Sequence, residues 1–219
     1  MGEKSEGAQV EELLALIEQS RDEGDPEREV GQSLKLYEIL KRRTPQDADT
    51  FQVAFGIAQI YDGQLDNMGA AVTYYEEALT ILETLSTEAT TWGVYMRVTT
   101  LGALALCYEN LDQLEEADTY FNRAISAYEQ HCEQAMASDT DEENASETKL
   151  ALLADLNASA AMIYYHYAGS LLAQEDCEEV KNLTEAALML AEHSSMPSED
   201  LEELQRCIHD LWLDMANKE

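Results

Sequence analysis

Two features of the sequence predict an all-α fold, an α-solenoid of about four helix pairs closed by one C-terminal helix. Apolar residues recur at the three- and four-residue spacings of amphipathic helices along most of the chain. In residues 101–125, side chains of ordered size also occupy fixed positions on the faces of two consecutive helices. The first face holds Leu101, Leu104, Ala105 and Tyr108, and the second holds Leu114, Ala117, Phe121, Ala124 and Ile125.

The spacing in residues 101–125, L-x-x-L-A-x-x-Y and then A-x-x-x-F-x-x-A, resembles the tetratricopeptide repeat. The resemblance implies a right-handed solenoid in which the first helix of each pair lines a concave groove. Tyr75 and Phe121 hold the same place in two repeats and are 46 residues apart, whereas the family's usual period is about 34 residues. The chain therefore resembles the subclass of the family whose helices are lengthened.

The first predicted pair is a degenerate repeat. A stripe of apolar residues at helical spacing predicts its first helix: Val10, Leu13, Leu14 and Ile17. Gly24 breaks that helix, Asp25 can cap the next one, and Pro26 suits its first position. The second helix is expected to end near Arg43, ahead of Pro45, which falls where the family has its terminating proline.

The second predicted pair follows the motif more closely. Its first helix, over residues 47–62, has an apolar face of Phe51, Ala54, Ile57, Ala58 and Tyr61. Its second helix repeats the second-helix pattern with Ala71, Tyr75, Ala78 and Leu79. The turn between the two helices is one residue longer than the turn in residues 108–117, so it departs slightly from the motif.

Two further pairs and a last helix complete the array. The third pair is expected to begin near residue 88 and to end near residue 137. In the fourth pair Thr184 replaces the aromatic residue of the second-helix pattern. Ser198 can cap a final helix, and an unpaired helix at the end of a repeat array usually covers the last apolar face.

Four regions are therefore expected along the chain. Residues 1–8 form a disordered tail, and residues 9–137 form three repeats. The acidic segment 138–147 is predicted to be a mobile loop, and residues 148–219 form the fourth pair with its capping helix.

The chain is strongly acidic, with 45 Asp and Glu against 13 Lys and Arg and a formal net charge of −32. Such a field repels nucleic acid and anionic membranes, and it favours basic partners. Solubility alone would also account for the charge, and composition leaves both explanations open. The chain has no apolar run of about 18 residues, so the sequence predicts no insertion into a membrane. Four separated cysteines without a CxxC indicate reduced thiols and a cytoplasmic protein, with the nucleus as the alternative.

No pattern in the chain predicts an enzyme, a cofactor or a metal site. The four histidines have neither HExxH nor zinc-finger spacing, and no G-x-S-x-G or phosphate-binding loop occurs. Asp139 and Asp141 resemble the start of a calcium-binding loop, but Leu150 stands where a bidentate glutamate is required. Ser138 and Thr140 each precede an acidic residue by three positions, which makes them candidate phosphorylation sites.

The family resemblance places a partner-binding groove on the first helices of the pairs. It assigns eight residues to this groove: Phe55, Gln59, Asp62, Leu106, Glu109, Asn110, Tyr165 and Gly169. These residues are apolar, polar or acidic, and none is Lys or Arg. The groove would therefore suit a protein or peptide segment with apolar and basic side chains.

The same positions argue against two other functions. A carboxylate clamp for the acidic C-termini of heat-shock chaperones, one use of this family, needs Lys, Arg and Asn in the groove. Its positions are occupied here by Phe55, Gln59, Gly102, Leu106, Tyr165 and Gly169. The phosphopeptide-binding 14-3-3 family needs a basic cluster in its groove, and here the basic residues cluster only at the end of a helix, in residues 41–43. We expect neither function.

Two functions stay open. The chain can be a non-enzymatic scaffold or adaptor that binds a segment of a partner protein in the groove. Alternatively, it can be a dedicated acidic chaperone for a basic client such as a ribosomal protein or a histone, a hypothesis that the net charge motivates. The two differ in their response to salt, because a client held by charge is released steeply as salt rises and an apolar groove retains its partner.

Overall fold

The computed structural model describes residues 6–85, 90–137, 147–173 and 177–218. All secondary structure in these residues is α-helical. The helices are α1 (Glu6–Asp22), α2 (Pro26–Arg43), α3 (Ala48–Gly63), α4 (Met68–Thr84), α5 (Thr91–Asn110), α6 (Leu114–Ala137), α7 (Glu147–Ala173), α8 (Cys177–Glu192) and α9 (Ser198–Lys218). The all-α, helical-repeat fold predicted from the sequence is therefore confirmed.

Contacts divide the chain into two compact units. The first comprises Met1–Glu88 together with Asn110–Asp112, and the second comprises Ala89–Glu109 together with Gln113–Glu219. The boundaries expected from the sequence, after residue 8 and around the acidic segment 138–147, stay predictions. Residues 138–146 lie outside the described residues, so the mobile loop and the phosphorylation sites Ser138 and Thr140 stay predictions.

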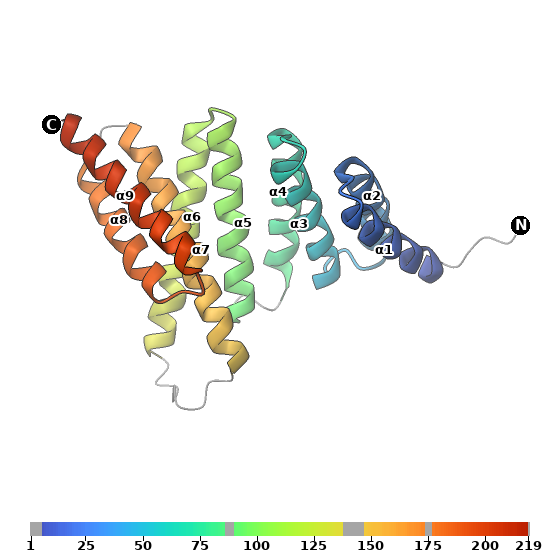
Figure 1. Ribbon diagram of the computed structural model, residues 1–219. Helices are drawn as coiled ribbons and strands as arrows, with labels where there is room; N and C mark the ends of the chain where they lie inside the picture. Colours follow the sequence, from blue (N-terminus) through green and yellow to red (C-terminus); the bar gives the residue numbers. More distant parts are fainter. Residues whose placement is uncertain (1–5, 86–89, 138–146, 174–176, 219) are drawn as a thin grey trace, which may run out of the picture. The chain divides into compact units, whose positions relative to one another are not determined.

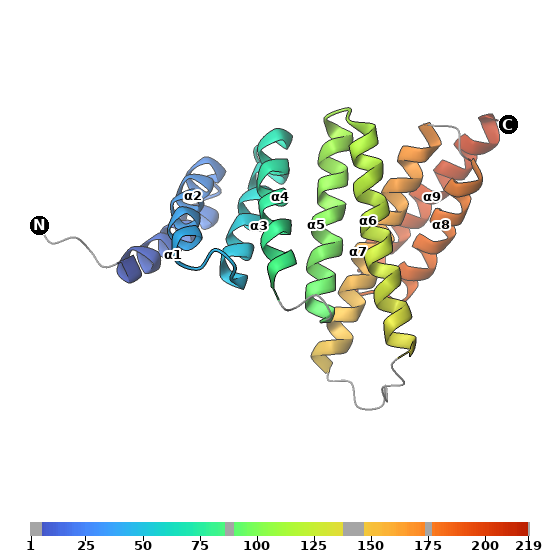
Figure 2. The same ribbon diagram turned by 180° about the vertical axis from the view of Figure 1, so that it is seen from behind.

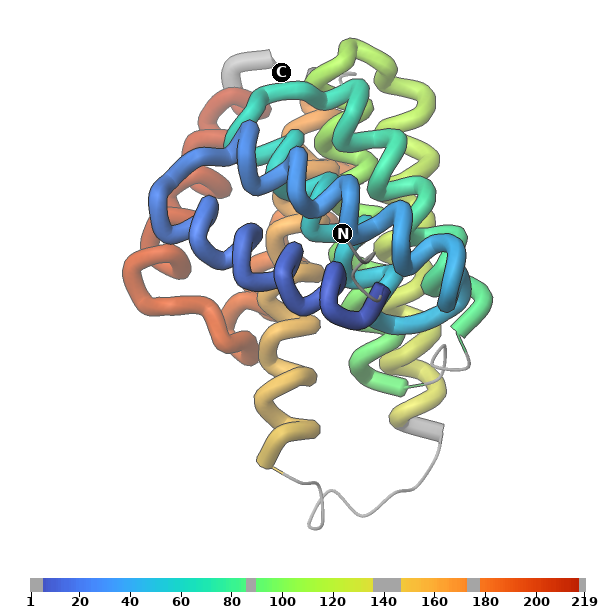
Figure 3. Tube along the Cα trace, turned by 90° about the vertical axis from the view of Figure 1, so that its right-hand side faces the viewer, coloured from blue at the N-terminus to red at the C-terminus, as the bar shows by residue number. Residues whose placement is uncertain are grey.

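The first unit contains two antiparallel helix pairs, α1–α2 and α3–α4, and α2 also packs against α3 (Figures 1 and 3). Its core follows the predicted apolar faces, with small residues where helices approach closely and large ones between them. The completely buried members are Phe51, Ala54, Ile57, Ala58, Ala71 and Ala78. In α1 only part of the predicted stripe is covered, since Ile17 is buried but Leu14 is 51% exposed.

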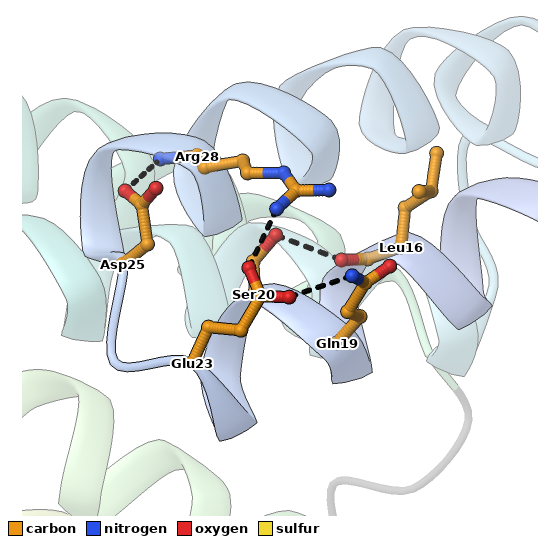
Figure 4. Close-up of polar contacts among 6 residues, drawn as sticks. All are labelled: Leu16, Gln19, Ser20, Glu23, Asp25 and Arg28. Atoms are coloured by element: carbon orange, nitrogen blue, oxygen red, sulfur yellow. Dashed lines mark hydrogen bonds and ion pairs between the residues drawn. The ribbon is translucent and has the colours of Figure 1, made fainter.

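The turn between α1 and α2 uses the capping residues that the sequence predicts (Figure 4). Gly24 has a positive φ of 66°, a conformation that costs glycine little. The Asp25 side chain accepts a hydrogen bond from the Arg28 backbone N–H at 3.0 Å, and Pro26 is the first residue of α2. Arg28 also forms an ion pair with Glu23, with Nη1 and Oε2 2.6 Å apart, which closes the turn from the side of α1.

The turns before α4 and α6 have the same design despite their different lengths. Asp66 and Asp112, with φ of 50° and 59°, lie in the left-handed region, and each stands five residues before the alanine that opens the second-helix pattern. Asn67 N–H donates to the Tyr61 carbonyl at 2.8 Å, and Gln113 N–H donates to the Tyr108 carbonyl at 2.9 Å. The extra residue that the sequence indicates in the first turn is thus inserted ahead of the aspartate.

The second unit contains the longer helices. Figures 1 and 2 show α5 and α6 side by side, and the rings of Tyr108 and Tyr120 stack between them with centroids 5.3 Å apart. α7 packs against α6 and α8, and α9 packs against both α8 and α7. Phe121 is fully buried and stacks on Tyr167 of α7, with centroids 5.1 Å apart.

Hydrogen bonds between side chains hold α6 and α7 together along their length. Asn122 Nδ2 donates to Tyr167 Oη at 2.8 Å, Tyr128 Oη donates to Asn157 Oδ1 at 2.9 Å, and Tyr164 Oη donates to Glu129 Oε1 at 3.1 Å. These three hydrogen bonds fix the orientation of α7, including the face that points away from α6.

One predicted core residue of α6 is not in this interface, because Leu114 is 43% exposed at the first turn of the helix.

Candidate partner-binding site

The predicted groove residues of α3 belong to the first unit, and they are only partly accessible. Phe55 is 9% exposed, and its ring lies 5.8 Å from that of Phe51 and 5.5 Å from that of Tyr75. Asp62 is half-buried and accepts a hydrogen bond from the Tyr75 hydroxyl at 3.3 Å. Gln59 is exposed. The prediction for Phe55 needs correction, because its ring packs in the core of the pair instead of facing a partner.

On α5 the predicted residues Leu106 and Glu109 are half-buried, while Asn110, the last residue of the helix, is exposed. Burial raises the pKa of Glu109 above its ordinary value, and a hydrogen bond with the Ser170 side chain of α7 opposes that rise. Glu109 therefore lies near α7 and is not simply a groove residue facing solvent. The sequence contained no sign of this contact, since it depends on how two distant helices pack.

The predicted residues Tyr165 and Gly169 share one side of α7 with Ala158 and Met162. Steps of four, three and four residues separate these positions, which places them on a single stripe of the helix. Met162 is 37% exposed, and a Cβ built at Gly169 would have no other atom within 4 Å. We call this stripe, residues 158, 162, 165 and 169, the α7 face. It is open to solvent at both Met162 and Gly169.

Part of the α7 face forms one wall of a pocket, and α9 and the connection before it form the others. The pocket has a volume of about 600 Å³, and we call it the α7–α9 pocket. Its lining residues are Ala158, Ser159, Met162, Tyr165, Ser195, Met196, Pro197, Asp200, Glu203, Leu204 and Cys207. In Figure 1 α9 crosses in front of α8 and α7, the arrangement that brings these residues together. All of them belong to the second unit.

Hydrogen bonds fix the connection between α8 and α9 against α7. Ser195 N–H donates to the Ala154 carbonyl at 3.1 Å, and its hydroxyl donates to Asp155 Oδ1 at 2.6 Å. Asn157 Nδ2 donates to the His193 carbonyl at 2.9 Å. Met196 and Pro197, which follow Ser195 directly and line the pocket, are thus held in place. The cavity is preformed and needs no partner to shape it.

Near its C-terminal end, α9 is attached to α8 through the side chain of Trp212. Trp212 Nε1 donates to Thr184 Oγ1 at 2.9 Å, and Thr184 is completely buried. Leu204 and Ile208 face inward and are 4% and 0% exposed. Together these contacts set the position of Asp200, Glu203 and the rest of the α9 wall.

The pocket is apolar inside and acidic around it. Asp200 and Glu203 are its charged lining residues, and no Lys, Arg or His lines it. The pKa of Tyr165 is raised first by burial, then by the neighbouring Cys207 thiol, and least by the negative charge of Asp210. The Tyr165 phenol therefore stays neutral at physiological pH. The site presents methionine, leucine and tyrosine side chains beside carboxylates.

Of the residues that line the pocket, the sequence had assigned only Tyr165 to a binding groove, and Met162, Met196 and Cys207 were not predicted. A pocket built from α7, α9 and a short connection depends on the angle at which α9 returns, and no local pattern encodes that angle. One signal was available, since Met162 lies three residues before Tyr165 and on the same stripe.

Comparison with known proteins identifies the family. Residues 51–81 and 98–131 match the family described as Tetratricopeptide repeat, and they fall within α3–α4 and α5–α6. The chain contains tetratricopeptide repeats in these two segments. Stacked repeats of this kind present extended surfaces to protein partners. The α7–α9 pocket lies outside the two matched segments.

The fold of this chain is shared with a solved structure, the crystal structure of BtubC (BKLC) from P. vanneervenii. The two are 18% identical, with a TM-score of 0.57, over 98% of this chain and 85% of that chain. At this level of identity the likeness establishes a shared fold. Comparison with curated proteins found no match.

Two further observations concern other classes of site. Among the described residues, no three His, Cys, Asp or Glu side chains are grouped as metal ligands would be. Of the helices in the described ranges, none is both long enough and apolar enough to cross a membrane.

Proposed function

We propose that this protein is a non-enzymatic scaffold or adaptor that holds a segment of a partner protein against the α7 face and the α7–α9 pocket. The observation that supports the proposal most strongly is the preformed pocket itself, which Tyr165 lines on α7, the first helix of the fourth pair expected from the sequence. In tetratricopeptide repeats the first helices carry the binding surface. Gly169 leaves room for a backbone to approach α7 closely, since no atom lies within 4 Å of a Cβ built there.

A dedicated chaperone for a basic client is the second candidate function. The net charge of −32 and the carboxylates of Asp200 and Glu203 at the pocket favour it. Such a chaperone would lose its client as salt rises from about 0.05 M to about 0.5 M, because exposed charges are screened over that range. A scaffold that binds chiefly through apolar contacts would keep its partner over the same range.

The experiment that tests the proposed function is affinity capture from cell lysate with four forms of the full chain. Gly169→Arg places a long side chain on the α7 face, and Gly169→Ala adds one methyl group at the same position. Gln130→Arg adds the same charge at an exposed position on α6. We expect the wild type, Gly169→Ala and Gln130→Arg to retain the same partner, and Gly169→Arg to retain at most about a tenth as much.

Equal retention by all four forms would contradict the proposal. Loss of the partner in both arginine variants would instead show that charge, and not the α7 face, governs capture. Running the comparison at low and at high salt separates the scaffold from the chaperone in the same series.

A further inference from the structure

We infer that the α7–α9 pocket anchors an apolar side chain of a partner segment that carries Lys or Arg on either side of that anchor. The inference rests on the proposed function and deepens it, because it specifies the chemistry of the segment.

The inside of the pocket selects for an apolar anchor. Met162, Met196 and Leu204 line it, and methionine side chains adapt to differently shaped apolar groups. Tyr165 adds a large aromatic ring to this lining. An aliphatic or aromatic side chain of a partner would remove these apolar surfaces from water.

The charges around the pocket select for basic neighbours of that anchor. Asp200 and Glu203 line the pocket and are exposed at its edge. Asp155 lies where the α8–α9 connection meets α7, and Asp210 is close enough to raise the pKa of Tyr165. Because Lys, Arg and His do not occur among the lining residues, a positively charged segment meets attraction on this rim and an acidic segment meets repulsion.

The same features disfavour other occupants. A terminal carboxylate or a phosphate is usually bound by cationic side chains, and no Lys, Arg or His lines this pocket. A polar metabolite needs several fixed donors and acceptors inside the cavity, whereas most of the lining surface here is apolar. The hydrogen-bonded connection at residues 193–195 keeps the pocket open, so a short segment can bind without first reshaping the protein.

The test is fluorescence anisotropy with the full-length protein and pooled, labelled nonapeptides. In the first pool the central residue is Leu, Met or Phe, two Lys or Arg flank it on each side, and the outer positions are random. The second pool replaces the central residue with Ser, and the third keeps the apolar centre but replaces the basic residues with Glu. The protein is used as wild type, as Asp200→Asn/Glu203→Gln, and as Glu199→Gln/Glu202→Gln.

The last variant is a matched control, because it makes the same change in net charge on exposed α9 residues that do not line the pocket. We expect the first pool to bind the wild type and the control at least tenfold more tightly than it binds Asp200→Asn/Glu203→Gln. We also expect it to bind the wild type at least tenfold more tightly than the serine pool does.

Equal binding of the apolar-centred and serine-centred pools would overturn the inference, because the acidic chain would then attract any basic peptide. Equal weakening by both double variants, or binding by no pool, would overturn it as well. A failure of this inference can be told apart from a failure of the proposed function. Capture of a partner by the Gly169→Arg and Gly169→Ala variants does not depend on the chemistry of the peptide pools.

Discussion

Gly102 of α5 and Ile163 of α7 lie so close that the glycine has no room for a side chain. A Cβ built at residue 102 would be 2.7 Å from both Cγ1 and Cδ1 of Ile163. Gly102 is buried, and Ile163 is 6% exposed. The missing side chain at residue 102 therefore sets how closely α5 approaches α7, the helix that carries the α7 face.

Replacement of Gly102 by alanine should destabilise the second unit. The added methyl group overpacks a closed contact, which typically costs about 1–3 kcal/mol and outweighs the better helix propensity of alanine. In an Ile163→Ala background the side-chain atoms that the new methyl group would contact are absent, so Gly102→Ala should be neutral or stabilising there. Urea denaturation of the two single variants and the double variant measures this coupling. Additive effects would show that the two residues are not in contact.

Replacement of Gly169 by alanine serves as the matched comparison, and it should stabilise the second unit instead of destabilising it. No neighbouring atom lies within 4 Å of a Cβ at this position, and an alanine in a helix is favoured over glycine by about 0.5–1 kcal/mol. The midpoint of urea denaturation should therefore rise. A fall would mean that the α7 face is closed at residue 169, and the binding surface would have to be placed elsewhere.

Phe121→Ala should be among the most damaging single substitutions in the second unit. The ring is 0% exposed and stacks on Tyr167 at 5.1 Å, so its loss should cost about 3–5 kcal/mol. Thermal or urea denaturation followed by circular dichroism tests the effect. An unchanged midpoint would remove the basis for assigning α5–α6 as a tetratricopeptide repeat.

The anchor between Trp212 and Thr184 should contribute measurably to the attachment of α9. Thr184→Val leaves the indole N–H of Trp212 without its protein acceptor, which should cost about 0.5–1.5 kcal/mol. Trp212→Phe removes that donor, so the double variant should be less destabilised than the sum of the two single variants. Native-state hydrogen exchange in α9 gives the local effect, and unchanged protection in Thr184→Val would contradict the role of this contact.

Stability should depend on pH through Glu109. Burial raises its pKa in the folded protein above the ordinary value of 4.5, so between that value and the raised pKa the folded state holds a proton that the unfolded state has lost. Stability conferred by the protonated group is present below that window and is lost as pH rises through it. Glu109→Gln should remove this component. In urea denaturation from about pH 4 to about pH 7, the free energy of unfolding of the variant should increase relative to that of the wild type as pH rises.

The caps and the repeat motif could be predicted because they are local. Asp25 and Pro26 fulfil the capping rule, and the shift of one residue between the turns at Asp66 and Asp112 can be counted directly in the sequence. Whether a residue at the end of a helix is buried depends also on how other segments pack around it, so the local pattern does not settle it. Leu114 fits the apolar stripe of α6, yet it lies on the first turn and is 43% exposed.

The candidate site could be predicted only in part, because it is assembled from distant segments. Tyr165 and Gly169 follow from the repeat positions on α7. The place of Leu204 in the pocket depends on the connection that Ser195 fastens to α7, which no local pattern encodes. Phe55 shows the opposite error. The family analogy places it in a groove, but its ring stacks on Phe51 and meets Tyr75 edge to face in the core of the pair.

The central claim is that a partner segment lies against the α7 face and the α7–α9 pocket, and site-specific photocrosslinking tests it most directly. Met162 and Met189 form a matched pair, since both are exposed methionines of the second unit, at 37% and 61%, but only Met162 lines the pocket. Each is replaced by a photoreactive phenylalanine, and the captured partner is irradiated in the complex. We expect a covalent product from position 162 and none from position 189. Crosslinking from position 189 alone, or equally from both, would contradict the claim.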